Sequence, residues 1–321
     1  MSSLIEQAAL RLEQLRRAGA AMPESAPKPP PEAPPAAPVK EVAPDRAAPQ
    51  PTAEPVPVPA VVPTPPVTSK RVEINLDALS AAGIVSPNSP RSQVADQYRV
   101  IKRPLISNAM GKGATPVENG NLIMVTSSLP GEGKSFTAIN LAISIAAELD
   151  NTVMLVDADV ARPSVLRVLG LPPGPGLLDL LSGDSPDLSS MLLKTNIDKL
   201  TLLPSGTPHE RATEMLASEA MTSLLQDMAK RYPDRIIVFD SPPLLLTTES
   251  RVLATHMGQI VMVIQAEKTL RSDVQDALAT IEACPVKMVV LNQARSSLTG
   301  GYGYGYGYGY GQGYGYGKKP G

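Results

Sequence analysis

Ser128-Leu-Pro-Gly-Glu-Gly-Lys-Ser135 is the stretch of this chain that decides its fold. An apolar run, Leu122–Val125, precedes it, and an amphipathic segment, Phe136–Ala146, follows. A strand, a glycine loop, a Lys-Ser pair and a helix in this order are typical of a phosphate-binding loop. Glycine amides can turn toward an anion, and the helix start presents unpaired N–H groups to the same phosphates. The pattern predicts a nucleoside triphosphate site, not merely a glycine turn between a strand and a helix.

The residues of the loop have distinct expected roles. Lys134 is expected to reach the terminal phosphates, and the Ser135 hydroxyl to bind the Mg²⁺ that accompanies ATP. The usual first glycine of such a loop is replaced by Ser128, whose small side chain should be tolerated. The predicted nucleotide-binding residues of this segment are Gly131, Glu132, Gly133, Lys134, Ser135 and Phe136.

Carboxylates end two apolar runs farther along the chain. Asp157 and Asp159 close the run that starts at Val153, and Asp240 closes the run that starts at Ile236. Since the carboxyl ends of parallel strands line one edge of a sheet, these side chains should converge on the loop. An Asp after a strand is otherwise a turn or cap residue, and this alternative stays open for Asp159. The predicted magnesium ligands are Ser135, Asp157 and Asp240, and the predicted catalytic residues are Lys134, Asp157 and Asp159.

Strands and helices are expected to alternate along the middle of the chain. Such alternation predicts an α/β fold with a doubly wound, mostly parallel sheet. Strands are expected near 121–126, 152–157, 199–203, 235–240, 259–265 and 286–292, and helices near 134–148, 211–231, 248–256 and 269–283.

Composition divides the chain into four parts. Residues 1–19 read as an amphipathic helix that could meet a membrane surface or a protein partner. Residues 20–70 read as a disordered linker, because 17 of the 34 prolines lie between positions 23 and 67. Residues 71–297 form the predicted phosphate-loop domain, and residues 298–321 form a Gly/Tyr-rich tail.

Several classes of function are disfavoured by what the chain lacks. A net charge of −2 gives no electrostatic basis for binding nucleic acid. The single cysteine, Cys284, excludes an intramolecular disulfide and fits a reducing compartment, while His209 and His256 are too scattered for a zinc site. No apolar run is long enough to span a membrane, and no secretory signal is visible. The expected location is the cytoplasm.

The tail alternates glycine and tyrosine. A strand is disfavoured there, because glycine at every second position gives no apolar face. Alone, such a segment could be adhesive, but beside an ATP site its phenols are candidate phosphate acceptors. These candidates are Tyr302, Tyr304, Tyr306, Tyr308, Tyr310, Tyr314 and Tyr316.

The loop, the acidic strand ends and the tyrosine tail together resemble the bacterial tyrosine kinases, phosphate-loop autokinases of polysaccharide export. The N-terminal Ser2–Ala8 and the segment Asp157–Ser164 are most similar to the exosortase-A-associated subgroup. The segment also departs from the family pattern, because Ala161 stands where an arginine is common. The resemblance covers roughly residues 72 to 316.

The resemblance implies further sites and partners. The helix by which such kinases assemble into rings carries Glu, Arg and Arg at three-residue steps; here Asp96, Arg99 and Lys102 hold those places. An alternative for these three is a solvated helix face with one ion pair. Asn292, at the end of the last predicted strand, is expected either to read the adenine edge or to begin a loop. Expected partners are a separate membrane polysaccharide co-polymerase as activator, further copies of the chain in a ring, and a cognate tyrosine phosphatase.

The resulting expectation is a tyrosine autokinase that regulates exopolysaccharide polymerisation or export from the inner face of the plasma membrane. Asp157 is the preferred group to orient or deprotonate the phenol, with Asp159 second. The main alternative is a positioning or partitioning ATPase, although such proteins usually carry a lysine early in the loop, where this chain has Leu129. A scaffold that uses ATP only for assembly is a further alternative, which the complete set of loop and acidic residues disfavours.

Overall fold

The computed structural model describes residues 69–87, 92–183, 187–231 and 234–295. The chain divides into two compact units, Met1–Val62 and Pro63–Gly321, and only the second contains described residues. The predicted helix at 1–19 and the tail at 298–321 therefore lie outside the described residues. The first strand begins at Lys70, one residue before the predicted start of the phosphate-loop domain.

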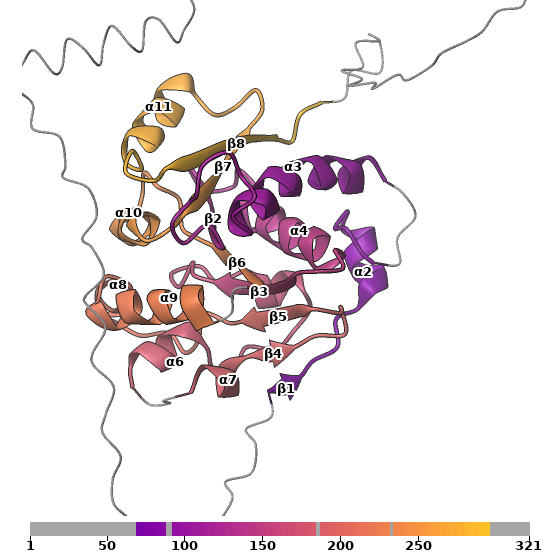
Figure 1. The fold of residues 1–321 in the computed structure, drawn as a ribbon, viewed down its shortest axis with the longest axis vertical. Coiled ribbons are helices and arrows are strands. Elements are labelled where there is room, and N and C mark those ends of the chain that lie inside the picture. The colour runs from indigo at the N-terminus through magenta and orange to yellow at the C-terminus, as the bar shows by residue number, and fades with distance from the viewer. Residues whose placement is uncertain (1–68, 88–91, 184–186, 232–233, 296–321) are drawn as a thin grey trace, which may run out of the picture. The chain divides into compact units, whose positions relative to one another are not determined.

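One mixed sheet forms the centre of the described chain (Figure 1). The strands lie in the order β1-β4-β5-β3-β6-β2-β7-β8, and every neighbouring pair is parallel except β4 with β5. Their bounds are β1 (Lys70–Arg71), β2 (Leu122–Ser127), β3 (Thr152–Asp157), β4 (Leu193–Lys194), β5 (Leu200–Leu203), β6 (Arg235–Asp240), β7 (Gln259–Gln265) and β8 (Val286–Asn292). The predicted doubly wound, mostly parallel α/β fold is confirmed.

Helices cover both faces of this sheet. Side chains of β2 alternate, so that Ile123 and Val125 join one apolar cluster while Leu122 and Met124 join the other. Helices α3 and α4 pack on the first face and α9 and α10 on the second (Figure 1). The helices are α2 (Leu76–Ala81), α3 (Gln93–Ala109), α4 (Lys134–Ala146), α5 (Val165–Val168), α6 (Leu177–Leu181), α7 (Leu188–Met191), α8 (Ala212–Leu216), α9 (Glu219–Arg231), α10 (Thr248–Thr255) and α11 (Arg271–Ala279).

All six predicted strands are present, and the predicted helices differ from the observed ones mainly at one break. The helix expected over 211–231 is two helices, α8 and α9. Ser218 lies between them, and its hydroxyl accepts a hydrogen bond from the Met221 amide at 3.2 Å, as a capping serine does at a helix start. Strands β1 and β4 and the short helices α2, α5, α6 and α7 were not predicted.

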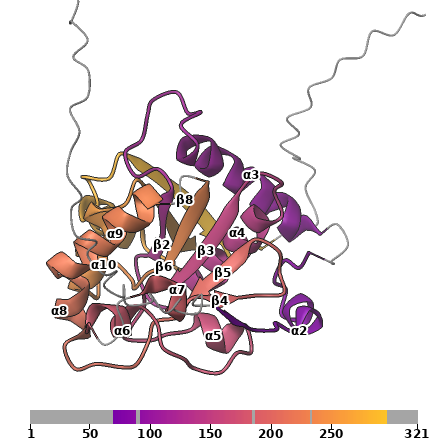
Figure 2. The ribbon, with the colours of Figure 1, turned by 60° about the horizontal axis from the view of Figure 1, so that its bottom comes forward.

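The carboxyl ends of the central strands meet at one edge of the sheet, where β5, β3, β6 and β2 run side by side (Figure 2). Asp157, the last residue of β3, is paired in register with Asp240, the last residue of β6. Strand β2 ends at Ser127 on the other side of β6 and leads directly into the glycine loop. The fold therefore brings the predicted loop and the predicted acidic residues to one edge.

Candidate active site

The glycine loop connects β2 to α4 in a conformation that requires its glycines. Gly131 and Gly133 have φ angles of +84° and +96°, a left-handed region that other L-residues rarely adopt. A Cβ at Gly133 would also lie 2.0 Å from Nδ2 of Asn292. Since α4 begins at Lys134 without a side-chain cap, its first amide groups are left for another acceptor.

Glu132 holds the loop from inside. Its side chain is buried; Oε2 accepts a hydrogen bond from the Leu129 amide at 2.9 Å, and Oε1 accepts one from the Thr269 hydroxyl. The Asn292 amide nitrogen donates to the Glu132 carbonyl at 2.9 Å. Glu132 and Asn292 thus bond to the protein's own loop, and the reading of adenine by Asn292 stays a prediction. Phe136 is half-buried and packs against the core beneath α3.

Lys134 is surrounded by carboxylates. Its Nζ lies 2.6 Å from Oδ2 of Asp159 and 3.7 Å from Oδ1 of Asp240. Burial disfavours the charged amine, but Asp240 and Asp159 outweigh that cost and the pKa of Lys134 is raised. The amine is therefore a fixed positive charge at the mouth of the loop.

Asp157 has a buried carboxyl group in which one oxygen accepts hydrogen bonds and the other has no hydrogen-bond partner among the described residues. Oδ2 accepts hydrogen bonds from the amides of Ser164, at 3.0 Å, and Val165, at 2.9 Å. Oδ1 is buried and has no hydrogen-bond partner among the described residues. Burial and the nearby Asp240 carboxylate raise the pKa of Asp157 to about 7. This carboxyl can take up or release a proton near neutral pH.

Asp240 is fully buried beside the loop. Burial raises its pKa, although Lys134 opposes this effect. The Ser164 hydroxyl lies 2.8 Å from Oγ of Ser135 and 3.5 Å from Oδ2 of Asp240, so it links the loop to the acidic strand ends. Oδ1 of Asp240 has no hydrogen-bond partner within the described ranges.

These groups suit a magnesium ion in part. Asp157 and Asp240 each have a buried carboxylate oxygen without a hydrogen-bond partner among the described residues, and Ser135 supplies a hydroxyl; all are hard oxygen ligands. The part of the chain that the structure describes contains no cluster of three or more His, Cys, Asp or Glu placed to hold an ion. This limited donor set fits Mg²⁺, which keeps several waters and takes ligands from substrate phosphates.

Asp159 makes the turn contact that the sequence left open and also pairs with Lys134, while its catalytic role stays a prediction. Oδ2 forms the ion pair with Lys134, while Oδ1 accepts a hydrogen bond from the Arg162 amide at 3.1 Å in a turn. Ser164 was not singled out from the sequence, although it ends the Asp157–Ser164 segment. Its position seven residues after Asp157 gave no sign that the chain would fold back onto Ser135.

The three residues predicted to assemble rings lie on α3 but differ in exposure. Asp96 and Arg99 form an exposed ion pair. Lys102 is buried, and its amine donates to the Ser144 carbonyl at 2.5 Å and pairs with Glu148 at 2.6 Å. The charge of Lys102 therefore ties α3 to α4 within one chain, and only Asp96 and Arg99 present their charges at the surface.

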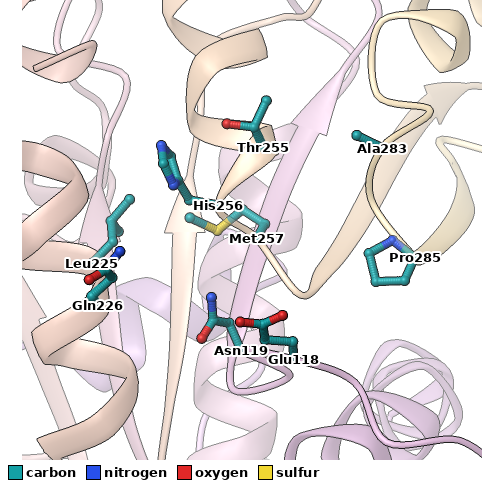
Figure 3. Close-up of a pocket in the computed structure, with 9 residues that line it drawn as sticks. All are labelled: Glu118, Asn119, Leu225, Gln226, Thr255, His256, Met257, Ala283 and Pro285. Atoms are coloured by element: carbon teal, nitrogen blue, oxygen red, sulfur yellow. The ribbon is translucent and has the colours of Figure 1, made fainter. Parts of the chain in front are cut away.

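A separate hollow of about 350 Å³ opens at the opposite edge of the sheet (Figure 3). Glu118 and Asn119, which precede β2, line it together with His256 and Met257, which precede β7. Because these residues lie at the amino ends of the strands, this hollow is distant from the phosphate loop.

The predicted acceptor tyrosines all lie outside the described residues. Among the described helices, none has the length and apolar character needed to span a membrane.

Comparisons with known proteins agree with this site. The AAA domain family matches residues 120–292, more than half of the chain. The chain is 29% identical over 222 residues to the tyrosine-protein kinase YwqD of Bacillus subtilis (strain 168), covering 68% of this chain and 90% of YwqD. It is 30% identical over 182 residues to the tyrosine-protein kinase ptk of Acinetobacter johnsonii, covering 56% of this chain and 24% of ptk.

One solved structure is similar in both fold and sequence. The chimerical protein CapA2B2 is similar with a TM-score of 0.56 and 27% identity over 71% of this chain and 95% of that one. The chain thus spans most of YwqD and CapA2B2 but about a quarter of ptk. The chain is also 32% identical over 192 residues to the tyrosine-protein kinase CpsD of Streptococcus agalactiae, covering 58% of this chain and 82% of CpsD. The chain belongs to the AAA domain family and is a bacterial tyrosine kinase.

Proposed function

We propose that this chain transfers the γ-phosphate of ATP to its own C-terminal tyrosines, Tyr302 to Tyr316, and so regulates exopolysaccharide polymerisation or export. The observation that carries the proposal is the position of Asp157. Its unbonded Oδ1 lies beside a phosphate loop whose lysine is already fixed, in a chain that ends in seven tyrosines. A loop that binds and hydrolyses ATP needs no such tail.

Binding of the triphosphate follows from the groups around the loop. The amides of Gly131, Gly133 and the start of α4 would surround the phosphates, and Lys134 would leave Asp159 to pair with them. Bound Mg²⁺ would neutralise phosphate charge, and Ser135, Asp157 and Asp240 are the residues that would hold it. The loop amides, Lys134 and the residues that would hold Mg²⁺ place positive charge around the phosphates, and such placement is the main contribution of a protein to phosphoryl transfer.

Transfer of the phosphoryl group to a tyrosine releases one proton from the phenol. The tyrosine Oη forms a bond to the γ-phosphorus as the bond from that phosphorus to the β,γ-bridging oxygen breaks, and ADP leaves. The phenol proton passes to Asp157, whose Oδ1 has no hydrogen-bond partner among the described residues and can accept it. Asp159 is the second choice, because its carboxylate is already paired with Lys134.

The tail can come from the same chain or from a neighbour. A glycine-rich chain from Arg295 to Tyr316 has an r.m.s. reach of roughly 25 Å, whereas β8 and β3 are four strand spacings, roughly 19 Å, apart. Reach therefore permits both. The family resemblance favours a ring in which Asp96 and Arg99 contact a neighbouring copy. A membrane polysaccharide co-polymerase as activator, a cognate phosphatase and a place at the inner face of the plasma membrane belong to the same proposal.

The first experiment compares the dephosphorylated wild type with Lys134→Met in Mg-ATP and maps phosphotyrosine by mass spectrometry. Modification of the tail in the wild type alone is expected. Lys112→Met, which removes an exposed lysine far from the loop in sequence, is the matched control and should behave as the wild type. Phosphate release without phosphotyrosine, even with a candidate membrane activator present, would favour the positioning ATPase.

A further inference from the structure

Ser164 begins helix α5, but its hydroxyl does not serve that helix. A serine at a helix start ordinarily accepts a hydrogen bond from one of the first amides through its side-chain oxygen. The Ser164 side chain makes no such bond to any described amide of α5. The amides of Ser164 and Val165 donate instead to Oδ2 of Asp157, at 3.0 and 2.9 Å. Since Asp157 takes the capping role, the Ser164 hydroxyl is left for a different partner.

The Ser164 hydroxyl lies against the glycine loop. Its Oγ is 2.8 Å from Oγ of Ser135, a normal length for a hydrogen bond between hydroxyls, and 3.5 Å from Oδ2 of Asp240. Ser135 is 29 residues away along the chain and Asp240 is 76 residues away. One small residue, only 9% exposed, therefore joins the loop to the end of β6 and the start of α5.

The contacts of Ser164 are all to residues that are proposed to hold magnesium. Its hydroxyl approaches Ser135 and Asp240, and its amide donates to Asp157. A ligand oxygen binds a metal better when a neighbouring group already orients it, because less side-chain freedom is lost on binding. The Lys134 amine also approaches Oγ of Ser135, but its distance of 3.4 Å is long for a hydrogen bond. Ser164 is therefore the stronger of these two restraints on the Ser135 hydroxyl.

We propose that Ser164 is a positioning residue for magnesium. Its hydroxyl holds the Ser135 hydroxyl beside Asp240 while the site is empty, so that the ligands on the loop and on the strand ends are already together. This role rests on the proposed magnesium site and does not depend on transfer of phosphate to tyrosine. In this role Ser164 contacts no phosphate, so its hydroxyl should matter for nucleotide binding only when metal is present.

Three substitutions isolate the hydroxyl. Ser164→Ala removes it and keeps the amide that donates to Asp157. Because the hydroxyl does not cap α5, this variant should fold. Ser164→Thr keeps a hydroxyl on the same carbon and is the rescue variant. Ser144→Ala is the matched control, because Ser144 is 4% exposed and lies near the far end of α4, the helix that Ser135 begins to form beside the loop.

Isothermal titration calorimetry of the full chain with ADP, once with Mg²⁺ and once with EDTA, measures how much the metal strengthens binding. In Ser164→Ala this strengthening should fall about tenfold, as loss of a residue that orients a metal ligand typically causes. The Kd for ADP in EDTA should stay within about twofold of the wild type. Ser144→Ala should match the wild type under both conditions, and Ser164→Thr should recover most of the strengthening that Ser164→Ala loses.

The outcomes separate the role of Ser164 from the sites on which it rests. Equal loss of ADP affinity with Mg²⁺ and with EDTA would show a general support of the loop and would overturn the positioning role. Unchanged strengthening by Mg²⁺ in Ser164→Ala, or a threonine variant that behaves as the alanine variant does, would overturn it too. A wild type that binds ADP equally well with Mg²⁺ and with EDTA would remove the magnesium site itself and this role with it. The kinase proposal is decided separately, by the mapping of phosphotyrosine.

Urea unfolding in EDTA verifies that each variant is folded. If Ser164→Ala does not fold, Ser164→Cys replaces the hydroxyl by a thiol, a much weaker hydrogen-bond donor of similar shape. The same loss of strengthening by Mg²⁺ is expected of the cysteine variant, and its absence there would overturn the positioning role.

Discussion

The Lys134 amine of the glycine loop lies 2.6 Å from the Asp159 carboxylate. The ion pair must loosen for the lysine to reach a nucleotide, because one amine cannot hold both anions at full strength. Asp159 therefore competes with the phosphates for Lys134. The same contact keeps the lysine in place while the loop is empty.

Removing this competition should tighten nucleotide binding. Asp159→Asn is expected to lower the Kd for ADP by about 2- to 10-fold when EDTA excludes metal, corresponding to about 0.4–1.4 kcal/mol. Isothermal titration calorimetry measures the change. Asp198→Asn, an exposed position on the loop before β5, is the control. Weaker ADP binding in Asp159→Asn would mean that the carboxylate supports the bound state instead.

The raised pKa of Asp157 should make stability depend on pH. The folded protein holds the Asp157 proton up to about pH 7, whereas the unfolded chain releases it near pH 4. The folded state thus loses stability as the pH rises from 4 to 7, by on the order of 4 kcal/mol in total. Asp157→Asn lacks this loss, so its stability relative to the wild type should increase from pH 5 to pH 8.

Urea unfolding at pH 5, 6.5 and 8, with EDTA and without nucleotide, tests this pH dependence. The difference in unfolding free energy between variant and wild type should grow with pH. A difference independent of pH would show that Asp157 titrates alike in the folded and unfolded chains. Asp198→Asn again serves as the control, because that side chain is exposed.

Glu132 should couple energetically to Thr269. Glu132→Ala removes the acceptor for the Leu129 amide and for the Thr269 hydroxyl, and should cost about 1–3 kcal/mol of stability. Thr269→Val should cost a similar amount, because it removes the bond to Glu132 and also the acceptor for the Gln265 amide at 3.0 Å. A double-mutant cycle measured by urea unfolding should give an interaction energy of about 0.5 kcal/mol or more. Additive effects would exclude this contact as a support of the loop.

The charges on α3 should separate assembly from stability. Arg99→Glu is expected to alter the sedimentation of the assembled protein while changing unfolding free energy by less than about 1 kcal/mol, because its ion pair with Asp96 is exposed. Glu148→Ala should cost more, since it leaves the buried Lys102 amine with the Ser144 carbonyl as its remaining partner. Unchanged sedimentation of Arg99→Glu would remove Arg99 from the proposed ring contact.

Local patterns were sufficient to predict the elements that carry the site. The loop before Lys134 has fixed spacing, and long apolar runs ending in Asp157 and Asp240 predict buried strands. Strands β1 and β4 have two residues each, too few to show any periodicity. The position of Ser164 and the pKa of Asp157 depend on tertiary contacts, so no pattern of neighbouring residues could indicate them.

Lys102 shows why equal spacing in sequence did not mean an equal environment. Three residues of an α-helix turn about 300°, so each three-residue step falls about 60° behind a full turn. Lys102 therefore lies about 120° around α3 from Asp96. That rotation brings Lys102 against α4, while Asp96 and Arg99 remain at the surface.

The contact between Asn292 and the glycine loop links the end of β8 physically to the nucleotide-binding loop. Asn292 donates to the Glu132 carbonyl at 2.9 Å and lies against Gly133. The Gly/Tyr segment starts only a few residues later along the chain. A pulling force on that segment would therefore act, through Asn292, on the backbone that surrounds the phosphates as well as on the neighbouring strand β7. Asn292, where the chain leaves the sheet toward the tail, also holds the glycine loop through its hydrogen bond to Glu132. A molecule that binds and pulls the tail would therefore act on the nucleotide-binding site.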